Sequence, residues 1–231
     1  MIKSRVAFGG EYNGPKVLIT VPTTGRVRKE VAEWLLVVMA YENHMLRCHG
    51  DVCFPIDRPY EQNQHNIVND LKEHGYEYWV SIDDDNPPIK NVLDLIFLQK
   101  DMIGCPTPVW KYVPGKAERP FMWNSYDYIP GEDAYKEHDP KEGLQEVDAV
   151  GTGCFVIAQY CFNHVSLRQG AFTRKIDDQG LVYKGNDISF CERFKAAGFH
   201  IFAHYDYPCR HITTIDLFDN AKAIGEMMSH G

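Results

Sequence analysis

Three consecutive aspartates, Asp83–Asp85, are the residues whose spacing points most directly to chemistry in this sequence. They follow an apolar segment, residues 78–82, whose tyrosine, tryptophan, valine and isoleucine are typical of a buried β-strand. Open α/β sheets bind ligands at the carboxyl ends of their strands. The pattern therefore predicts oxygen ligands at a position in the fold where a ligand would lie.

Adjacent carboxylates repel one another unless a cation or a hydrogen-bond donor compensates their charge. Mg²⁺ and Mn²⁺ prefer oxygen ligands and need few of them from the protein. In an extended backbone Asp83 and Asp85 project to one side and Asp84 to the other, so Asp83 and Asp85 are the expected metal-facing pair. Taken alone, the aspartates are equally consistent with an acidic turn that caps a helix beginning after Pro88.

The composition is that of a globular protein: 231 residues, of which 44% are hydrophobic and 24% charged. The longest apolar run, residues 34–41, is much shorter than the roughly 20 residues of a membrane span. The N-terminus lacks the apolar core of a signal peptide, so we expect a cytoplasmic protein without a membrane span. A net charge of −8 argues against broad electrostatic capture of nucleic acid, although it permits a local basic patch.

The seven cysteines are odd in number and include no Cys-x-x-Cys pair. This spacing argues against a disulfide framework and against a zinc ribbon. Because most of them lie in apolar segments, we expect buried free thiols.

Strand and helix patterns alternate through the first half of the chain. Strands are expected at 16–22, 51–56, 78–82 and from 101 towards 110, and helices at 28–46, 63–74 and 91–100. This alternation predicts an α/β fold with a mostly parallel sheet flanked by helices.

Residues 111–146 break the alternation, with four prolines and six aromatic residues. Such an insertion in a compact domain is more often a functional loop or small hairpin than a linker. Its rings are equally able to form a satellite core. Residues 147–157 then form a strand pattern interrupted by Gly151 and Gly153, and glycine in a strand often marks the close approach of a ligand or another backbone. A helix at 185–197, a strand at 199–203 and a weakly amphipathic helix at 216–229 are expected to follow.

Several of these segments, in this order, resemble metal-dependent glycosyltransferases of the GT-A fold, particularly the family-2-like enzymes of phages and bacteria. Residues 82–85 look like the family's Asp-x-Asp motif, residues 148–153 resemble the strand that carries acceptor-side residues, and residues 185–191 resemble the Gly-Glu-Asp block. The likeness spans about residues 16–215. It departs from the family at Asn186, where an acidic residue is usual, and at His65, where many relatives have arginine.

The resemblance implies one GT-A-like domain, with a nucleotide-sugar half at about 16–110 and an acceptor half at 111–215. It implies Mn²⁺ or Mg²⁺ held by Asp85 and His211, with Asp83 acting through water or the donor ribose. Asp187 would be the catalytic base of an inverting transfer, although an aspartate at a helix start is also a good N-cap. A UDP-sugar is the expected donor, and the implied donor-binding residues are Thr23, Asp57, Asn66, Asp83 and Asp84.

The implied acceptor is a glycan or a hydroxymethylated base in DNA, the latter if the protein is a phage enzyme. The implied acceptor-binding residues are Trp110, Lys111, Trp123, Gly151, Thr152 and Gly153. Lysines and arginines at 111, 116, 119, 168, 174 and 175 would form a phosphate-binding rim, or are simply scattered surface charges. A sugar nucleotidyltransferase is an alternative enzyme, but it needs a Gly-rich loop after the first strand, where residues 22–26 offer one glycine. A binding module without turnover is the non-enzymatic alternative, for which Asn186 is the one indication.

Overall fold

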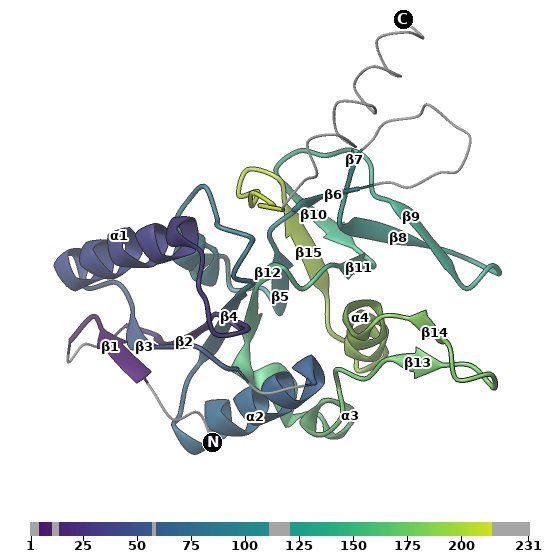
Figure 1. Cartoon of the computed structure of the whole chain (residues 1–231), viewed down its shortest axis with the longest axis horizontal. Coiled ribbons are helices and arrows are strands. Elements are labelled where there is room, and N and C mark those ends of the chain that lie inside the picture. Colours follow the sequence, from purple (N-terminus) through teal and green to yellow (C-terminus); the bar gives the residue numbers. More distant parts are fainter. Residues whose placement is uncertain (1–4, 11–13, 57–58, 111–120, 214–231) are drawn as a thin grey trace, which may run out of the picture.

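The computed structural model describes residues 5–10, 14–56, 59–110 and 121–213. Within them the central feature is an eight-stranded sheet in the order β1-β3-β2-β4-β12-β5-β15-β10 (Figure 1). Its strands are β1 (Arg5–Phe8), β2 (Lys16–Thr20), β3 (His49–Cys53), β4 (Tyr78–Ile82), β5 (Met102–Gly104), β10 (Leu144–Val147), β12 (Cys154–Ala158) and β15 (Ile201–His204).

Five of these strands run in one direction. β3 and β4 are each parallel to β2, and β15 is parallel to β5. β12 lies between β4 and β5 and is antiparallel to both, so β4 and β5 share a direction. β1 and β10 add antiparallel strands at the two edges. The predicted α/β class is confirmed, and the sheet is mixed because three of its strands run against the other five.

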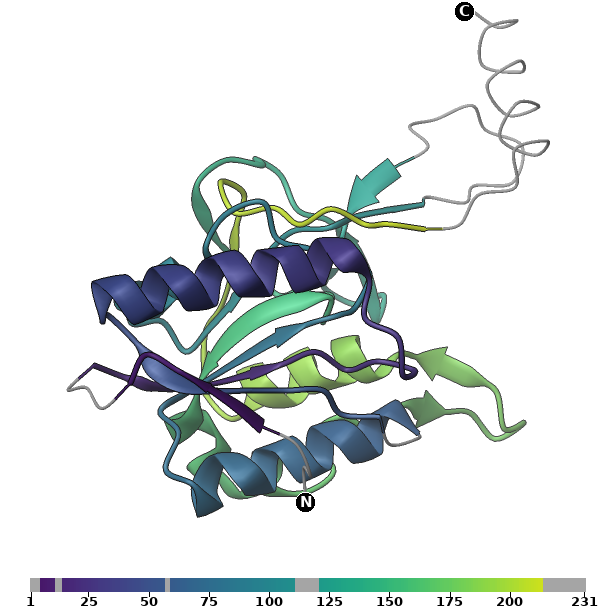
Figure 2. The same ribbon diagram turned by 60° about the vertical axis from the view of Figure 1, so that its left-hand side comes forward.

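Helices cover both faces of the sheet, and each face has its own apolar core. The helix α1 (Lys29–Met45) and the 3₁₀ helix η1 (Val92–Leu98) contribute to the core on one face. The helices α2 (Tyr60–Glu73), α3 (Val165–Arg168) and α4 (Asn186–Ala196) contribute to the core on the other, and Figure 2 shows α1 on the opposite side of the sheet from α2 and α4. Alternate residues of β2 divide between the cores, with Val17 and Ile19 on the α1 side and Leu18 on the α2 side.

Strand β4, which leads into the three aspartates, is held rigidly in the centre of the sheet. Its Trp79 is fully buried and makes an edge contact with Phe155 of β12 at 4.9 Å between ring centroids. The indole Nε1 donates a hydrogen bond to Thr20 of β2 over 2.9 Å, which satisfies its polar group inside the core. Because contacts with both neighbouring strands, β2 and β12, fix Trp79, the end of β4 and the aspartates that follow it have a well-defined position.

Several elements differ from the sequence expectations. The strand expected from 101 towards 110 is two strands, β5 in the main sheet and β6 (Pro108–Trp110) in a separate pair. The expected helix at 91–100 is the 3₁₀ helix η1, capped by the Asn91 side chain, while Pro88 instead pairs with Cys209. The expected strand at 147–157 is two strands, because β11 (Ala149–Val150) belongs to a small separate sheet and the chain turns before β12. Strand β1 was not expected.

The described part of the 111–146 insertion is built from antiparallel strands. β6 (Pro108–Trp110) pairs with β7 (Phe121–Trp123), and β8 (Ser125–Ile129) pairs with both β9 (Ala134–Glu137) and β11. A further hairpin, β13 (Lys175–Ile176) with β14 (Val182–Lys184), precedes α4. The insertion ends in β10, which extends the main sheet. The expected helix at 216–229 lies outside the described residues, and no helix among those described is long and apolar enough to cross a membrane.

Candidate active site

The carboxyl ends of the five co-directional strands meet at one edge of the sheet and gather most of the predicted residues there. Thr23 follows β2, Asp83–Asp85 follow β4, and His211 follows β15. Because β12 runs the opposite way, the turn before it, residues 151–153, reaches the same edge. Open α/β sheets bind their ligands at such an edge.

A pocket of about 370 Å³ opens at this edge. Thr23 and the three aspartates line it, together with Pro22, Thr24, Pro59, Tyr60, Asn63 and Arg174. Arg174 also pairs with Glu61 at 2.5 Å, so a cation lies at the rim of an otherwise acidic pocket. The Thr23 hydroxyl accepts hydrogen bonds from the backbone N–H groups of Gly25 and Arg26, which fixes the turn after β2.

Asp83 is the aspartate most firmly held by the protein. Its backbone N–H donates to the Gly153 carbonyl over 2.7 Å, and its carboxylate accepts a hydrogen bond from the Tyr60 hydroxyl over 3.0 Å. Burial, reinforced by the nearby charges of Asp85, Asp84 and Asp187 and opposed by the Tyr60 hydrogen bond, raises the pKa of Asp83 to about 8. A cation bound among these carboxylates would offset the repulsion between their negative charges.

Asp85, which lines this pocket, lies close to His211, which is not among the residues that line it. His211 Nε2 lies 3.8 Å from Asp85 Oδ2, which is too long for a hydrogen bond. The distance is within the sum of two metal–ligand distances, about 4.2 Å for Mg²⁺. His211 Nδ1 donates to the Pro108 carbonyl over 2.9 Å, because a carbonyl only accepts. A neutral His211 therefore has its Nε2 lone pair free to face Asp85, the arrangement typical of metal-binding histidines.

The backbone holds these two residues together. Residues 208–212 run alongside residues 85–89: Ile212 N–H donates to the Asp85 carbonyl and Arg210 N–H to the Pro87 carbonyl. Within the described residues, Asp83, Asp85 and His211 do not bring three ligand atoms within 4.8 Å of one another. The residues present thus fit a cation with two close protein ligands and other positions left for a ligand or water.

Asp187 lies in the first turn of α4 but does not cap it. The N-cap is Gly185, which makes no side-chain capping bond, and the Asn186 side chain donates to Gln64 over 3.3 Å. The Asp187 carboxylate accepts the Ile188 N–H over 2.8 Å, and burial raises its pKa. The charge of Asp187 is also among the causes that raise the pKa of Asp83.

The glycines before β12 accommodate two asparagine side chains. A Cβ on Gly151 would lie 2.4 Å from Asn124 Nδ2, and one on Gly153 would lie 2.3 Å from Asn86 Oδ1. Between the glycines, Thr152 is buried. Burial raises the pKa of the Tyr60 phenol, and Thr152 only partly opposes that rise. These contacts give a structural reason for the glycines and leave their expected acceptor role a prediction.

The aromatic residues expected on the acceptor side gather around the β6–β7 hairpin. Trp123 lines an open hollow of about 390 Å³ with Pro108, Phe121, Met122, Glu137 and Lys141. Trp110 is half-exposed and packs on Phe121 with ring centroids 4.5 Å apart. Because the Pro108 carbonyl binds His211, the hairpin adjoins the candidate metal site.

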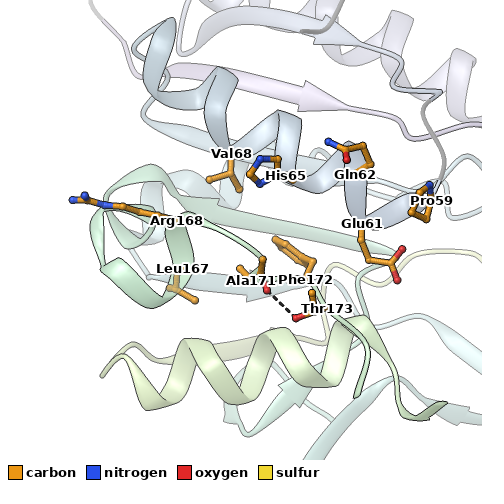
Figure 3. A pocket seen from close by; sticks show the side chains of 11 residues that line it. Pro59, Glu61, Gln62, His65, Val68, Leu167, Arg168, Ala171, Phe172 and Thr173 are labelled. Atoms are coloured by element: carbon orange, nitrogen blue, oxygen red, sulfur yellow. Dashed lines mark hydrogen bonds between the residues drawn. The ribbon is translucent and has the colours of Figure 1, made fainter. Parts of the chain in front are cut away.

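A smaller pocket of about 170 Å³ lies next to the acidic one, between α2 and residues 167–173. In Figure 3, His65 and Val68 project from α2 towards Phe172. The two pockets share Pro59, and the Glu61–Arg174 pair joins them. His65, where the sequence departs from the usual arginine of the family that it resembles, thus lines this second pocket.

No family model and no curated protein sequence matches this chain. Among solved structures, A197 from STIV is similar with a TM-score of 0.53 and 15% identity, over 86% of each chain. GalNAc-T7, solved with UDP, GalNAc and Mn²⁺, is similar with a TM-score of 0.50 and 11% identity, over 88% of this chain and 44% of that chain. The chain has the GT-A fold. At such low identity the likeness establishes the fold, and the activity has to be argued from the site.

Some predicted residues of this GT-A site are not in the pocket. Asp57 and Lys111 lie outside the described residues. Asn66 accepts a hydrogen bond from Gln62, whereas Asn63, one helical turn earlier, lines the pocket. A helical repeat of three to four residues would have pointed to Asn63.

Tyr60 had no signal in the sequence, because it begins α2 three residues before the expected start of the helix. Arg174, one of the basic residues considered for a phosphate-binding rim, lines the pocket from an irregular loop. Asn86 and Asn124, which fill the spaces beside the glycines, were not expected either.

Gly153→Ala should destabilise this edge of the GT-A fold. The new methyl group would collide with Asn86, which is 5% exposed and donates to Asp85, so relief requires a shift beside the aspartates. We expect the free energy of unfolding, measured by urea denaturation, to fall by about 1–3 kcal/mol. Asn86→Ala in the same chain should recover part of that loss, and strictly additive effects of the two changes would contradict the clash.

Proposed function

We propose that this protein is a metal-dependent glycosyltransferase that transfers a sugar from a nucleotide-sugar donor to an acceptor hydroxyl. The observation that carries the proposal is the pocket where three aspartates at the end of β4 meet Thr23, with His211 held beside Asp85. The likeness to GalNAc-T7, whose structure holds UDP, GalNAc and Mn²⁺, supports this proposal.

The donor would lie in the acidic pocket, with a UDP-sugar as the first candidate. Bound Mn²⁺ or Mg²⁺ would supply positive charge to the diphosphate leaving group. Asp85 and His211 would hold that cation, and Asp83 would act through water or the donor ribose, fixed in place by Tyr60. Thr23 and Asp84 line the same space, and Asp57 and Asn66 complete the proposed donor set.

We place the acceptor on the Asp187 side of the pocket, against residues 151–153 and the β6–β7 hairpin. Asp187 would take the proton of the attacking hydroxyl as general base, which makes the transfer inverting. Trp110 and Trp123, with Lys111, offer rings and charge to an acceptor, either a glycan or a modified base in DNA. The donor half would thus span about residues 16–110 and the acceptor half 111–215 of one domain.

Incubation with a panel of labelled nucleotide sugars tests the proposal directly. We expect slow release of free sugar from one donor, dependent on Mn²⁺ or Mg²⁺, and faster transfer once the right acceptor is added. Parallel arms with glycans and with hydroxymethylated DNA identify the acceptor class. Formation of a nucleotide sugar from a sugar phosphate and a nucleoside triphosphate would indicate a nucleotidyltransferase instead. Donor binding without turnover in any arm would indicate a binding module.

Trp123→Ala should impair acceptor transfer and spare donor hydrolysis. Trp123 lines the hollow beside the β6–β7 hairpin, so its loss removes a stacking surface, worth about 1–3 kcal/mol per stacked base in nucleic-acid binding, without touching the aspartates. The ratio of transfer to hydrolysis should therefore fall by about 5- to 150-fold. Trp34→Ala, the same change on α1, is the control and should leave the ratio unchanged. An equal loss of both activities in Trp123→Ala, with a lower melting temperature, would assign the ring to the core.

A further inference from the structure

Three cysteines that are distant in the sequence converge in the core behind the acidic pocket. The sulfur atoms of Cys105, Cys154 and Cys209 all lie within 4.8 Å of one another. Each side chain is at most 3% exposed, and all three are free thiols. The other four cysteines, at 48, 53, 161 and 191, are also buried and free but join no such group among the described residues.

The sheet register explains why the three meet. Phe155 of β12 pairs with Gly104 of β5, and Cys105 N–H donates to the Cys154 carbonyl, so these two cysteines are cross-strand neighbours on one face. Cys209 lies in the segment that crosses this face, where its N–H donates to the Pro106 carbonyl over 2.9 Å. In Figure 1, β12, β5 and β15 lie side by side, as this arrangement requires.

A histidine, His204, lies beside one of the three cysteines, Cys105. Ala203 of β15 pairs with Gly104 of β5 in a parallel register, so the next residues, His204 and Cys105, are also neighbours on the same face. His204 Nδ1 is buried and has no hydrogen-bond partner within the described residues. A buried imidazole nitrogen without a hydrogen-bond partner is costly unless something binds it.

We propose that Cys105, Cys154 and Cys209 form a structural zinc site. His204 is not part of the group whose ligand atoms lie within 4.8 Å of one another, so its side chain would rotate to become the fourth ligand. Three thiolates and one imidazole are a common ligand set of closed structural zinc sites. Sulfurs bound to one Zn²⁺ at about 2.3 Å are about 3.8 Å apart, a spacing the cluster accommodates. Each thiol releases its proton to solvent as its Zn–S bond forms.

The site would tie together three segments that the sequence separates: the end of β5, the start of β12 and the segment after β15. That last segment also carries His211, two residues beyond Cys209. The zinc site nevertheless stands apart from the proposed transfer reaction, because its ligands are sulfur and a different histidine. Failure of either proposal leaves the other intact.

Elemental analysis of the whole protein, purified under reducing conditions from zinc-supplemented cells, tests the site. We expect about one zinc ion per chain, largely lost in Cys209→Ala and kept in Cys161→Ala, which removes a buried thiol outside the cluster. His204→Ala should weaken zinc retention during dialysis against a chelator. Protein produced with Co²⁺ should show a thiolate-to-metal charge-transfer band that Cys209→Ala abolishes.

The wild-type protein alone decides the question if Cys209→Ala does not fold. X-ray absorption at the zinc edge should then report three sulfur neighbours, which separates this site from zinc bound at Asp85 and His211. Wild-type protein that carries no sulfur-bound zinc and develops no charge-transfer band with Co²⁺ would overturn the proposal and leave the cysteines as packed core thiols.

Discussion

Asp187→Asn should lower the single-turnover rate of sugar transfer by about 10²–10⁴-fold, the usual contribution of a general base. The change keeps the shape of the side chain and removes its ability to take a proton. Asp187 does not cap α4, because Gly185 occupies the N-cap position, so loss of a capping bond cannot account for a large effect. The Ile188 N–H retains an acceptor in the asparagine amide oxygen. Affinity for the donor and the melting temperature should therefore stay close to those of the wild type.

The matched control is Asp178→Asn, the same isosteric loss of one carboxylate at an exposed position. A rate for Asp187→Asn within threefold of the wild-type rate would rule out the base role. The pH profile gives a second test. Because burial raises the pKa of Asp187 and only the ionised form accepts a proton, activity should fall on acidification from a higher pH than an exposed aspartate would give. The anomeric configuration of the product, read by NMR, then tests inversion.

The sequence was sufficient to predict the elements and the position of the aspartates where local pattern and sheet geometry agree. Apolar segments identified β2, β4 and the helices α1 and α2, and the aspartates after β4 reach the expected edge because strand direction decides where loops lie. The sequence was insufficient where pairing partners decide the outcome. β12 runs antiparallel between β4 and β5, and its apolar run carries no sign of its direction or of its neighbours.

The same limit applies to the site. His211 was expected beside Asp85 from the order of motifs, but its orientation depends on the Pro108 carbonyl, about one hundred residues away along the chain. Gly151 and Gly153 were interpreted as positions where a ligand or another backbone approaches closely, whereas the groups packed against them are asparagine side chains. Such contacts depend on packing between distant segments, so no local spacing reveals them.

Asp85→Ala and His211→Ala should each weaken Mn²⁺ binding in the presence of a nucleoside diphosphate. Loss of a residue that merely supports a metal ligand typically costs about 10–100-fold in affinity, so loss of a ligand itself should cost at least that much. The pairing of residues 85–89 with 208–212 is made by backbone groups, which both variants keep. Fold and melting temperature should therefore survive while metal affinity, measured by titration calorimetry, falls.

Two controls separate a direct ligand from a general change in charge. Asp178→Ala removes an exposed aspartate and His200→Ala an exposed histidine, both outside the paired segments. Each should leave Mn²⁺ affinity unchanged. Because His211 Nδ1 is bound to the Pro108 carbonyl, Nε2 is the nitrogen that would face the cation. If both Asp85→Ala and His211→Ala bind Mn²⁺ as the wild type does, the cation is held elsewhere, and Asp83 and Asp84 become the residues to change next.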